Sequence, residues 1–471
     1  MKRFLLTPSQ SKIVVGVKNN TMGKIWVVGG AVRDIILRRD PKDIDFATNL
    51  RPGAVKRLVK DLGFILIPDQ TAQDHGITRV VDKHSGGIID IATLRKDDAC
   101  DGRHARVSFT QSLKKDLARR DLTINAIAAE VDEVGHINQI IDPFGGQRDI
   151  EDRVIRFVGS PIARVKEDRL RMIRACRFMA LSEGWTWSRK ANHALMAYMG
   201  DLHEVSKERI RDEILKAMSY PYPGGFIRAL NDVDLLKHII SPVYDGLDVD
   251  QNEYHAEDVF EHSVGSLDAS VSLTDNVLLR LAALLHDVGK PSSMSTASDG
   301  RVHFYRHEVL GASIAYNWMQ ELRFSKKEID YVTKLIRHHQ WRFEKDSKDK
   351  TIRKWLQDVG RDVWRDLITL RCADRKGNLA KRDKPMITRH MRDLINKAER
   401  IIEESQALFR EDLAIDGHDL KELGVPPGPI FKEIFSNMLG IVVTDPSRNT
   451  KEWLTSYVQK NYIKEKSNGK S

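Results

Sequence analysis

Residues 26–49 of the chain read WVVGGAVRDIILRRDPKDIDFATN, and they decide the fold of the region around them. The apolar run 25–28 predicts a short β-strand that ends at Gly29 and Gly30, and a helical segment carrying Arg33 follows. Paired glycines let the backbone approach a triphosphate closely, the start of a helix favours an anion, and an arginine adds charge-assisted hydrogen bonds. The pattern therefore predicts a strand, turn and helix that bind nucleotide phosphates.

A pair of carboxylates follows in the same stretch. Pro41 ends the helical pattern, and a second strand is predicted to carry Asp43 and Asp45. Residues two apart on a strand point to the same face, so the two carboxylates should converge on one spot. Paired, partly exposed carboxylates favour hard divalent cations, and Mg²⁺ is the expected cofactor because it binds between a few carboxylates and substrate phosphates.

Length, charge and cysteine content limit the class of protein. The chain has 471 residues, enough for two to four domains. It carries 76 Lys and Arg against 67 Asp and Glu, a net charge of +9 that suits a nucleic-acid partner. Three scattered cysteines without metal-binding spacing indicate a reducing compartment. No apolar run approaches membrane-spanning length, so we expect a cytoplasmic protein with no membrane partner and no obligate protein partner.

The region after the first motif continues an alternating pattern of helices and strands. Residues 51–63 read as a helix, 64–67 as a strand, and 75–81 with 87–93 as a hairpin. Asp90 on the last of these strands is a candidate third carboxylate, although an edge-strand acid facing water fits the sequence nearly as well. The polar, glycine-broken stretch 96–112 is predicted to be a mobile loop.

Four charged side chains recur at every third position within the stretch 167–178. They are Asp168, Arg171, Arg174 and Arg177, and on one helix they would form a slanted polar ridge. Cytosine and adenine each present an amino donor beside an acceptor ring nitrogen, whereas uracil and guanine present the reverse polarity. A carboxylate and a guanidinium would therefore accept C and A and refuse U and G. The alternative is a solvated face with intrahelical ion pairs.

A second constellation of histidines and acids lies in the later part of the chain. His262, His286, Asp287 and Asp374 are expected to bind a divalent metal ion whose identity is open, since helical bundles build metal sites from side chains of several helices. Two further histidines, His307 and one of His338 and His339, are candidates for ligands of a second metal ion or for phosphate contacts.

Two family resemblances follow from these motifs. Four motifs follow one another along the chain: Gly-Gly-x-x-Arg-Asp, Lys-Asp-x-Asp, RRDLTINA at 119–126 and Glu-Asp-x-x-Arg at 167–171. This series resembles the class II nucleotidyltransferases, the family of the tRNA CCA-adding enzymes and bacterial poly(A) polymerases. The resemblance implies that Arg120 reaches the bound nucleotide, with Asn125 as a weaker candidate either for a sugar contact or for a residue that supports the nucleotide-binding side chains. It also implies that Asp168 and Arg171 select the base, and that the loop around 101–104 serves addition of the final A. The later histidines and acids resemble the HD phosphohydrolase superfamily.

The resemblance implies an α+β fold, with a nucleotidyltransferase head of mixed sheet and helices followed by a helical neck, HD domain and tail. The expected boundaries are 20–148 for the head, 149–245 for the neck, 250–400 for the HD domain and 401–471 for a tail that frays after residue 457. The implied activity is addition or repair of the tRNA 3′-terminal CCA from CTP and ATP without a template, with tRNA as partner and an HD-type phosphohydrolase activity. The alternatives are a poly(A) polymerase, a CC-adding enzyme, or an HD phosphohydrolase with an RNA-binding head.

Overall fold

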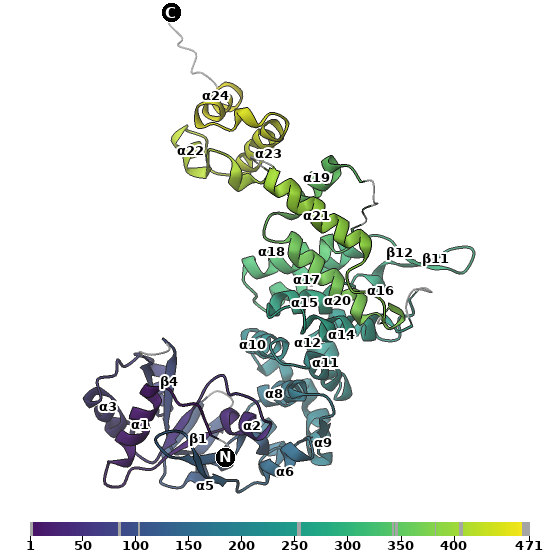
Figure 1. Ribbon diagram of the computed structural model, residues 1–471. Helices are drawn as coiled ribbons and strands as arrows, with labels where there is room; N and C mark the ends of the chain where they lie inside the picture. Colours follow the sequence, from purple (N-terminus) through teal and green to yellow (C-terminus); the bar gives the residue numbers. More distant parts are fainter. Residues whose placement is uncertain are drawn as a thin grey trace, which may run out of the picture. The chain divides into compact units, whose positions relative to one another are not determined.

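The computed structural model describes residues 3–463 apart from 83–85, 102–103, 252–255, 342, 344–346, 382 and 405–407. The chain divides after Tyr244 into two compact units, which are described separately. The first unit contains a mixed sheet with helices, and the second is almost entirely helical (Figure 1). The predicted fold class, an α+β head followed by helical regions, is confirmed.

A six-stranded sheet in the order β3-β4-β2-β1-β7-β8 forms the centre of the first unit. Its strands are β1 (Ile25–Val28), β2 (Phe46–Thr48), β3 (Ile77–Val81), β4 (Ile88–Thr93), β7 (Ala128–Val131) and β8 (Ile137–Ile141). β2 and β4 run parallel, and the other neighbours are antiparallel. Every residue of β1 is buried, which explains why its sequence is continuously apolar instead of alternating. The predicted strand 25–28 and the predicted hairpin are confirmed.

Helices cover this sheet and complete the head. They are α1 (Pro8–Lys18), α2 (Gly30–Ile36), α3 (Pro52–Asp61), α4 (Gln70–Asp74), α5 (Leu113–Ala118), the 3-10 turn η1 (Thr123–Asn125) and α6 (Gly146–Glu151). Helices α1 and α3 contact each other and the sheet (Figure 1). The predicted strand 64–67 is reduced to an isolated bridge between Leu66 and Val80, with hydrogen bonds from the Ile67 N–H to the Arg79 carbonyl and from the Val81 N–H to the Ile65 carbonyl. The side chain of Ile65 is exposed.

The stretch predicted as a mobile loop is a two-stranded ribbon instead. β5 (Arg95–Asp101) and β6 (His104–Phe109) pair antiparallel, with an irregularity between Asp97 and Ala99. Polar composition suggested a loop, but the two segments satisfy each other's backbone hydrogen bonds whatever side chains they carry. Of the motif 101–104, residues 102–103 lie outside the described residues.

The remainder of the first unit is a set of helices around α8. In chain order the elements are α7 (Pro161–Glu167), α8 (Leu170–Phe178), the 3-10 turns η2 (Met179–Leu181) and η3 (Met199–Glu204), α9 (Arg189–Tyr198), α10 (Lys207–Met218), α11 (Pro223–Asp232), α12 (Leu236–Ile239) and α13 (Ser241–Tyr244). Two short strands, β9 (Val154–Ile155) and β10 (Thr186–Trp187), pair in parallel. α8 packs against both α10 and α11, and its apolar face is buried.

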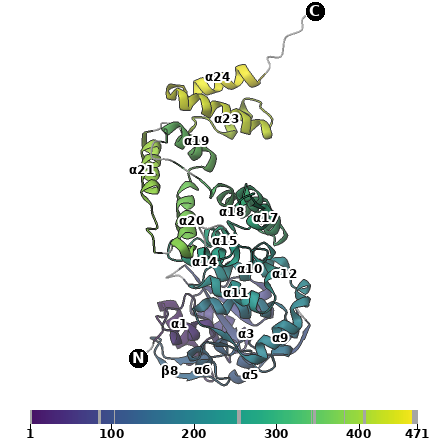
Figure 2. The same ribbon diagram turned by 90° about the vertical axis from the view of Figure 1, so that its right-hand side faces the viewer.

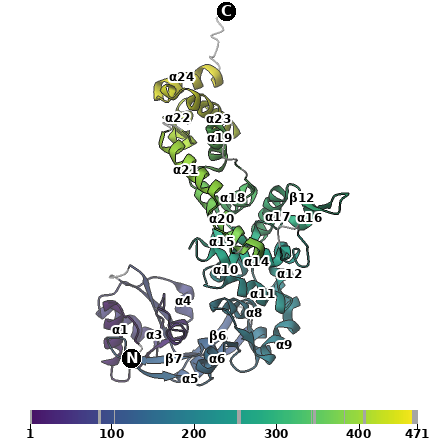
Figure 3. The same cartoon turned by 45° about the vertical axis from the view of Figure 1, so that its right-hand side comes forward.

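The second unit begins with a bundle in which α14 lies along α20 and α15 (Figure 2). Its elements are α14 (Val259–Ser270), α15 (Val277–Leu285), α16 (Lys290–Ser293), β11 (Met294–Thr296), β12 (Val302–Phe304), α17 (His307–Glu321), α18 (Lys326–His338), α19 (Asp349–Val359), α20 (Trp364–Gly377), the 3-10 turn η4 (Leu379–Lys381) and α21 (Arg389–Glu404). A Cβ at Gly265 would lie 2.9 Å from the Gly377 carbonyl oxygen, so this glycine lets α14 approach α20 closely. The β11–β12 hairpin projects from the bundle beside α16 and α17 (Figure 3).

The C-terminal helices enclose a small core of their own. They are α22 (Gly417–Glu422), α23 (Pro429–Thr444) and α24 (Lys451–Tyr462), with the 3-10 turns η5 (Arg410–Asp412) and η6 (Pro446–Arg448). The expectation of fraying after residue 457 is wrong as far as Tyr462, because Val458 is buried in that core, and residues 464–471 lie outside the described part. No helix in the described ranges is long and apolar enough to cross a bilayer.

Candidate nucleotide site and metal centre

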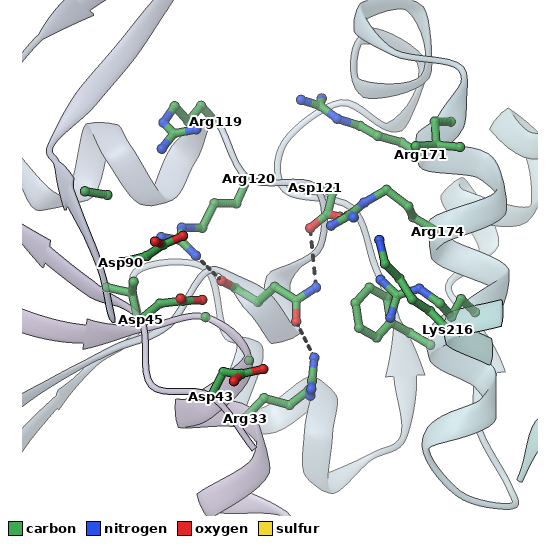
Figure 4. A pocket seen from close by; sticks show the side chains of 18 of the residues that line it. Arg33, Asp43, Asp45, Asp90, Arg119, Arg120, Asp121, Arg171, Arg174 and Lys216 are labelled. Carbon is green, nitrogen blue, oxygen red and sulfur yellow. Dashed lines mark hydrogen bonds and ion pairs between the residues drawn. The ribbon is translucent and has the colours of Figure 1, made fainter. Parts of the chain in front are cut away.

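A pocket of about 790 Å³ in the first unit brings the predicted residues of the head and neck together. They are Gly29, Gly30, Arg33, Asp43, Asp45, Arg120, Asp168, Arg171, Arg174 and Arg177. The acids Asp43, Asp45 and Asp90 lie on the side of the sheet, while Arg171 and Arg174 reach in from the helical side (Figure 4). A ligand in this pocket would contact Asp43, Asp45 and Asp90 on the sheet side, and Asp168 together with the guanidinium groups of Arg171 and Arg174 on the helical side.

The acidic end is built by a loop and a strand. Asp43 and Asp45 were predicted on a strand but lie in the loop before β2, which begins only at Phe46. Asp90 is on β4, as predicted, and its carboxylate is 3.1 Å from Arg79 Nε. Desolvation in the pocket, followed by the negative charges of Asp90 and Asp43, raises the pKa of Asp45. A cation would relieve that repulsion, so the donor set fits Mg²⁺ held by one or two carboxylates together with ligand phosphates.

The glycine turn and Arg120 fit closely against each other. Gly29 has a φ of +73°, and a Cβ built there would lie 2.8 Å from Nη1 of Arg120. Another residue at position 29 would therefore be strained and would displace the guanidinium. Burial holds the pKa of Arg120 below its usual value, although the charges of Asp116, Asp121 and Asp45 oppose that shift. An anionic ligand would add a favourable charge to this half-buried cation.

A polar chain of side chains crosses the floor of the pocket, and the sequence interpretation missed its central member, Asp121. Arg174 Nη2 lies 2.8 Å from the Asp121 carboxylate, Asn125 Nδ2 donates to the same carboxylate at 3.4 Å, and Arg33 Nη1 donates to Asn125 Oδ1 at 2.8 Å (Figure 4). Burial alone would raise the pKa of Asp121, but Arg174 and the hydrogen bonds lower it to about 2. Of the two roles predicted for Asn125, these contacts fit that of a residue that supports Arg33 and Asp121. The only signal for Asp121 was its place within the Arg-Arg-Asp motif.

The predicted ridge on a single helix is interrupted at its first member. α7 ends at Glu167 and α8 begins at Leu170, and between them Asp168 has an extended backbone with φ −158° and ψ 110°. The break is stabilised because Asp168 Oδ1 accepts the Leu170 N–H at 3.1 Å. The prediction of one continuous helix across this stretch is therefore wrong.

Asp168 and Arg171 both line the pocket, but each is ion-paired with another residue. Asp168 Oδ2 accepts from Arg209 Nη2 at 2.6 Å, and Arg171 Nη1 pairs with Glu167. Arg209 belongs to α10 and was not identified from the sequence. Each carboxylate oxygen has a second lone pair, and Arg171 has donors beyond Nη1, so both side chains retain hydrogen-bonding capacity towards a ligand.

Arg174 and Arg177 differ in their exposure and in their contacts with other side chains. Arg177 is buried, its Nε donates to Glu213 at 2.6 Å, and it also contacts the Tyr220 hydroxyl. Arg174 is about one-third exposed and lies between Asp121 and Glu213. Of the two, Arg174 is the one with a surface open to a ligand.

The histidines and acids of the second unit converge into two adjoining triads of potential metal ligands. Each triad brings three ligand atoms within 4.8 Å of one another, and the triads are His262, His286, Asp374 and Asp287, His307, His339. Asp287 connects them, since its Oδ2 lies 3.1 Å from His286 Nε2 and its Oδ1 lies 3.3 Å from His307 Nε2. Of the two adjacent histidines left open by the sequence, the structure places His339 in the cluster.

The ring orientations in this cluster fit metal coordination. Nδ1 of His286, His307 and His339 each donates to a backbone carbonyl oxygen, at 2.8, 2.8 and 2.7 Å. Nδ1 carries the proton in such a bond, so each neutral ring turns the lone pair of Nε2 towards the centre. Burial alone would lower the pKa of His262, but hydrogen bonds to Asp374 and Glu257 raise it to about 9. A divalent ion would replace that proton, and three histidines or acids per position are a suitable donor set.

Three regions of the chain match known family models. Residues 25–156 match the Poly A polymerase head domain, residues 189–246 match the model described as the probable RNA and SrmB-binding site of polymerase A, and residues 259–375 match the HD domain. These regions contain, respectively, the acidic end of the pocket, helices behind its basic end, and both metal-ligand triads.

Curated relatives and a solved structure resemble the chain over most of its length. It is 30% identical over 328 residues to the multifunctional CCA protein of Legionella pneumophila (strain Lens), covering 67% of this chain and 74% of that protein. It is 29% identical over 358 residues to the A-adding tRNA nucleotidyltransferase of Deinococcus radiodurans, covering 74% and 76%. The Bacillus stearothermophilus CCA-adding enzyme in complex with CTP has the same fold, with a TM-score of 0.60, 23% identity and coverage of 97% of this chain and 98% of that one.

Proposed function

The chain belongs to the class II family of CCA-adding enzymes and poly(A) polymerases and is a tRNA nucleotidyltransferase with an HD domain, and we propose that it builds or repairs the entire CCA end from CTP and ATP. The observation that carries the proposal is the single pocket in which Asp43 and Asp45 face Asp168 and Arg171. Such a pocket holds a nucleotide by its phosphates at one end and by its base at the other.

The chemistry is attack of the tRNA 3′-hydroxyl on the α-phosphate of a nucleotide, with pyrophosphate leaving. Asp43 and Asp45 would hold Mg²⁺, which when bound makes the hydroxyl more acidic and neutralises the phosphate charge. Arg120 and Arg174 supply positive charge along the pocket, and phosphoryl transfer needs little beyond positioning and charge stabilisation. The basic excess of the chain suits its tRNA partner.

Base selection is assigned to Asp168 and Arg171. In this assignment Asp168 accepts from the amino group of cytosine or adenine, and Arg171 donates to the adjacent ring nitrogen. The contacts to Arg209 and Glu167 hold both side chains in place without exhausting their lone pairs or donors.

An assay of nucleotide addition tests the activity. The protein is mixed with tRNA that lacks CCA, and in parallel with tRNA that ends in CC, and is given CTP, ATP, UTP and GTP singly and together. We expect two C additions with CTP alone and a further A only when ATP is also present. A addition to tRNA that already ends in CC, with no C addition, would assign an A-adding enzyme instead. Long A tails would assign a poly(A) polymerase, and C additions that never proceed to A would assign a CC-adding enzyme.

The second unit is proposed to hydrolyse phosphate esters with divalent metal ions bound at the two triads. His286→Ala together with Asp287→Ala is expected to abolish phosphomonoesterase and phosphodiesterase activity, because these residues serve both metal positions. The same variant should add CCA at the wild-type rate, since its changed residues lie outside the nucleotide pocket. Loss of CCA addition by a variant with an unchanged unfolding temperature would contradict independent sites. A head that serves only to bind RNA, with hydrolysis as the sole activity, would appear as hydrolysis without any nucleotide transfer.

A further inference from the structure

Among the described residues, Glu257 is the residue outside the two triads whose carboxylate accepts a hydrogen bond from the ring of a predicted metal ligand; Glu308 Oε2 lies 3.8 Å from His307 Nδ1, too far for such a bond. His262 Nδ1 donates to Glu257 Oε1 at 3.1 Å, whereas the corresponding Nδ1 atoms of the other three histidines in the cluster donate to backbone carbonyls. The side chain of Glu257 is 3% exposed, and that of His262 is fully buried. Burying a carboxylate costs free energy unless hydrogen bonds or charges compensate it, so the contacts of Glu257 are what allow an acid at this position.

The Glu257 carboxylate is itself held in a fixed position. The backbone N–H of Leu379 donates to both of its oxygens, at 3.3 and 3.2 Å, and the N–H of Ala256 donates to Oε2 at 3.1 Å. Leu379 follows the helix that carries Asp374, another member of the same triad. Glu257 therefore ties the ring of His262 to the end of the helix that supplies a second ligand.

A second contact joins the same loop to the other triad. Gln251 Nε2 donates to the carbonyl oxygens of Glu257 and Asp258, at 3.1 Å each. Gln251 Oε1 accepts from Lys290 Nζ at 2.6 Å, and Lys290 Nζ is also 2.6 Å from Asp287 Oδ2. The backbone of the loop is thereby connected to the bridging acid, whereas the Glu257 carboxylate, of the four histidine rings in the cluster, contacts that of His262.

These contacts make the two metal positions unequal, although each has one aspartate and two histidines. Each aspartate also has a cationic neighbour: Lys290 pairs with Asp287, and Arg371 lies 3.2 Å from Asp374. A neighbouring cation therefore does not distinguish the two metal positions. A carboxylate that accepts the second N–H of a ligating imidazole fixes its tautomer and strengthens it as a donor. Within the described ranges, the triad of His262, His286 and Asp374 has this hydrogen bond, whereas in the other triad Nδ1 of His307 and of His339 donates to a backbone carbonyl.

We infer that Glu257 is a positioning residue that makes the triad of His262, His286 and Asp374 the tighter of two divalent-metal positions, so that this position fills first. The inference rests on the proposed metal-dependent function of the second unit and goes beyond it by assigning the order of loading. The carboxylate acts through His262 and does not itself contact the metal ion.

The test is a Co²⁺ titration of the full chain, freed of metal and held in excess Mg²⁺ to occupy the head. Bound Co²⁺ is followed by calorimetry and by its visible absorption, and signal lost in His286→Ala is assigned to the second unit. We expect two successive equivalents in the wild type. In Glu257→Gln the first equivalent should bind roughly 10- to 100-fold more weakly with an altered absorption band, while the second is unchanged. Glu257→Asp, which retains the charge, should recover part of the difference.

Glu261→Gln is the matched control, because Glu261 lies four residues further on, in the first turn of α14 beside His262 in sequence, and is exposed. It should bind both equivalents as the wild type does. Unchanged affinities and absorption in Glu257→Gln would overturn the inference, as would an equal weakening of both equivalents together with a lower unfolding temperature. A wild type without any Co²⁺ binding that depends on His286 would overturn the metal site itself, and with it the role of Glu257.

Discussion

Asp43→Ala and Asp45→Ala are each expected to lower CTP incorporation into tRNA lacking CCA by a factor of about 10³ or more. Both carboxylates line the pocket at its acidic end, and the charge stabilisation that a bound metal ion contributes is worth several kcal/mol in the transition state. Affinity for tRNA should stay close to that of the wild type, because neither residue supplies positive charge for the phosphate backbone. Initial rates with radiolabelled CTP and filter binding of tRNA measure the two quantities separately.

The matched control for this prediction is Asp40→Ala. Asp40 is an exposed acid in the same loop, three residues before Asp43, and it does not line the pocket. Its replacement should leave the rate unchanged. If Asp43→Ala or Asp45→Ala retained substantial CTP incorporation, the assignment of these carboxylates to the metal ion would be wrong.

The features that the sequence predicted well are those set by short stretches of chain. The run 25–28 is apolar at every position because β1 lies in the middle of the sheet and is buried on both faces. Gly29 then has a positive φ, which only glycine adopts without strain, so the end of the strand could be predicted. In the same way the hairpin of β3 and β4 follows from alternation and turn residues.

The features that the sequence could not supply are contacts between distant segments. Arg209 reaches Asp168 across 41 positions, Glu213 reaches Arg177 across 36, and Arg174 reaches Asp121 across 53. Each of these residues is an ordinary charged residue in its own neighbourhood, and only packing of α8 against α10 and the head selects its partner. Asp43 and Asp45 were placed on a strand for a different reason: an extended loop and a strand have similar local sequence patterns.

The choice between His338 and His339 illustrates a different limit. Both are histidines at the end of one helix, and successive residues of a helix point about 100° apart. His339, the residue just after α18, is buried against His307 with ring centroids 5.2 Å apart, whereas His338 is not in either triad. The sequence does not give the orientation of α18 relative to α17, so it cannot show which of the two histidines faces His307.

Asp168→Ala is expected to reduce discrimination as well as rate. Without this acceptor the amino group of cytosine or adenine loses its partner, and a lost or mismatched hydrogen bond is worth roughly 1–3 kcal/mol, or about one to two powers of ten in preference. UTP and GTP should therefore compete measurably better against CTP and ATP. Arg171→Ala should have a similar effect because it removes the donor that faces the ring nitrogen. Competition assays with pairs of nucleotides on tRNA ending before CCA give the ratio of kcat/KM values directly.

Arg169→Ala is the control for this prediction. Arg169 lies between Asp168 and Arg171 in sequence, but it pairs with Asp201 and Glu204 and does not line the nucleotide pocket. Its replacement should leave the nucleotide preference unchanged, and thermal unfolding separates any loss of stability from a loss of selection. If the Asp168 and Arg171 variants kept the full preference for C and A and showed only a uniform loss of rate, the two residues would not read the base. Their ion pairs with Arg209 and Glu167 would then be their whole role, as parts of a charged surface beside the active site.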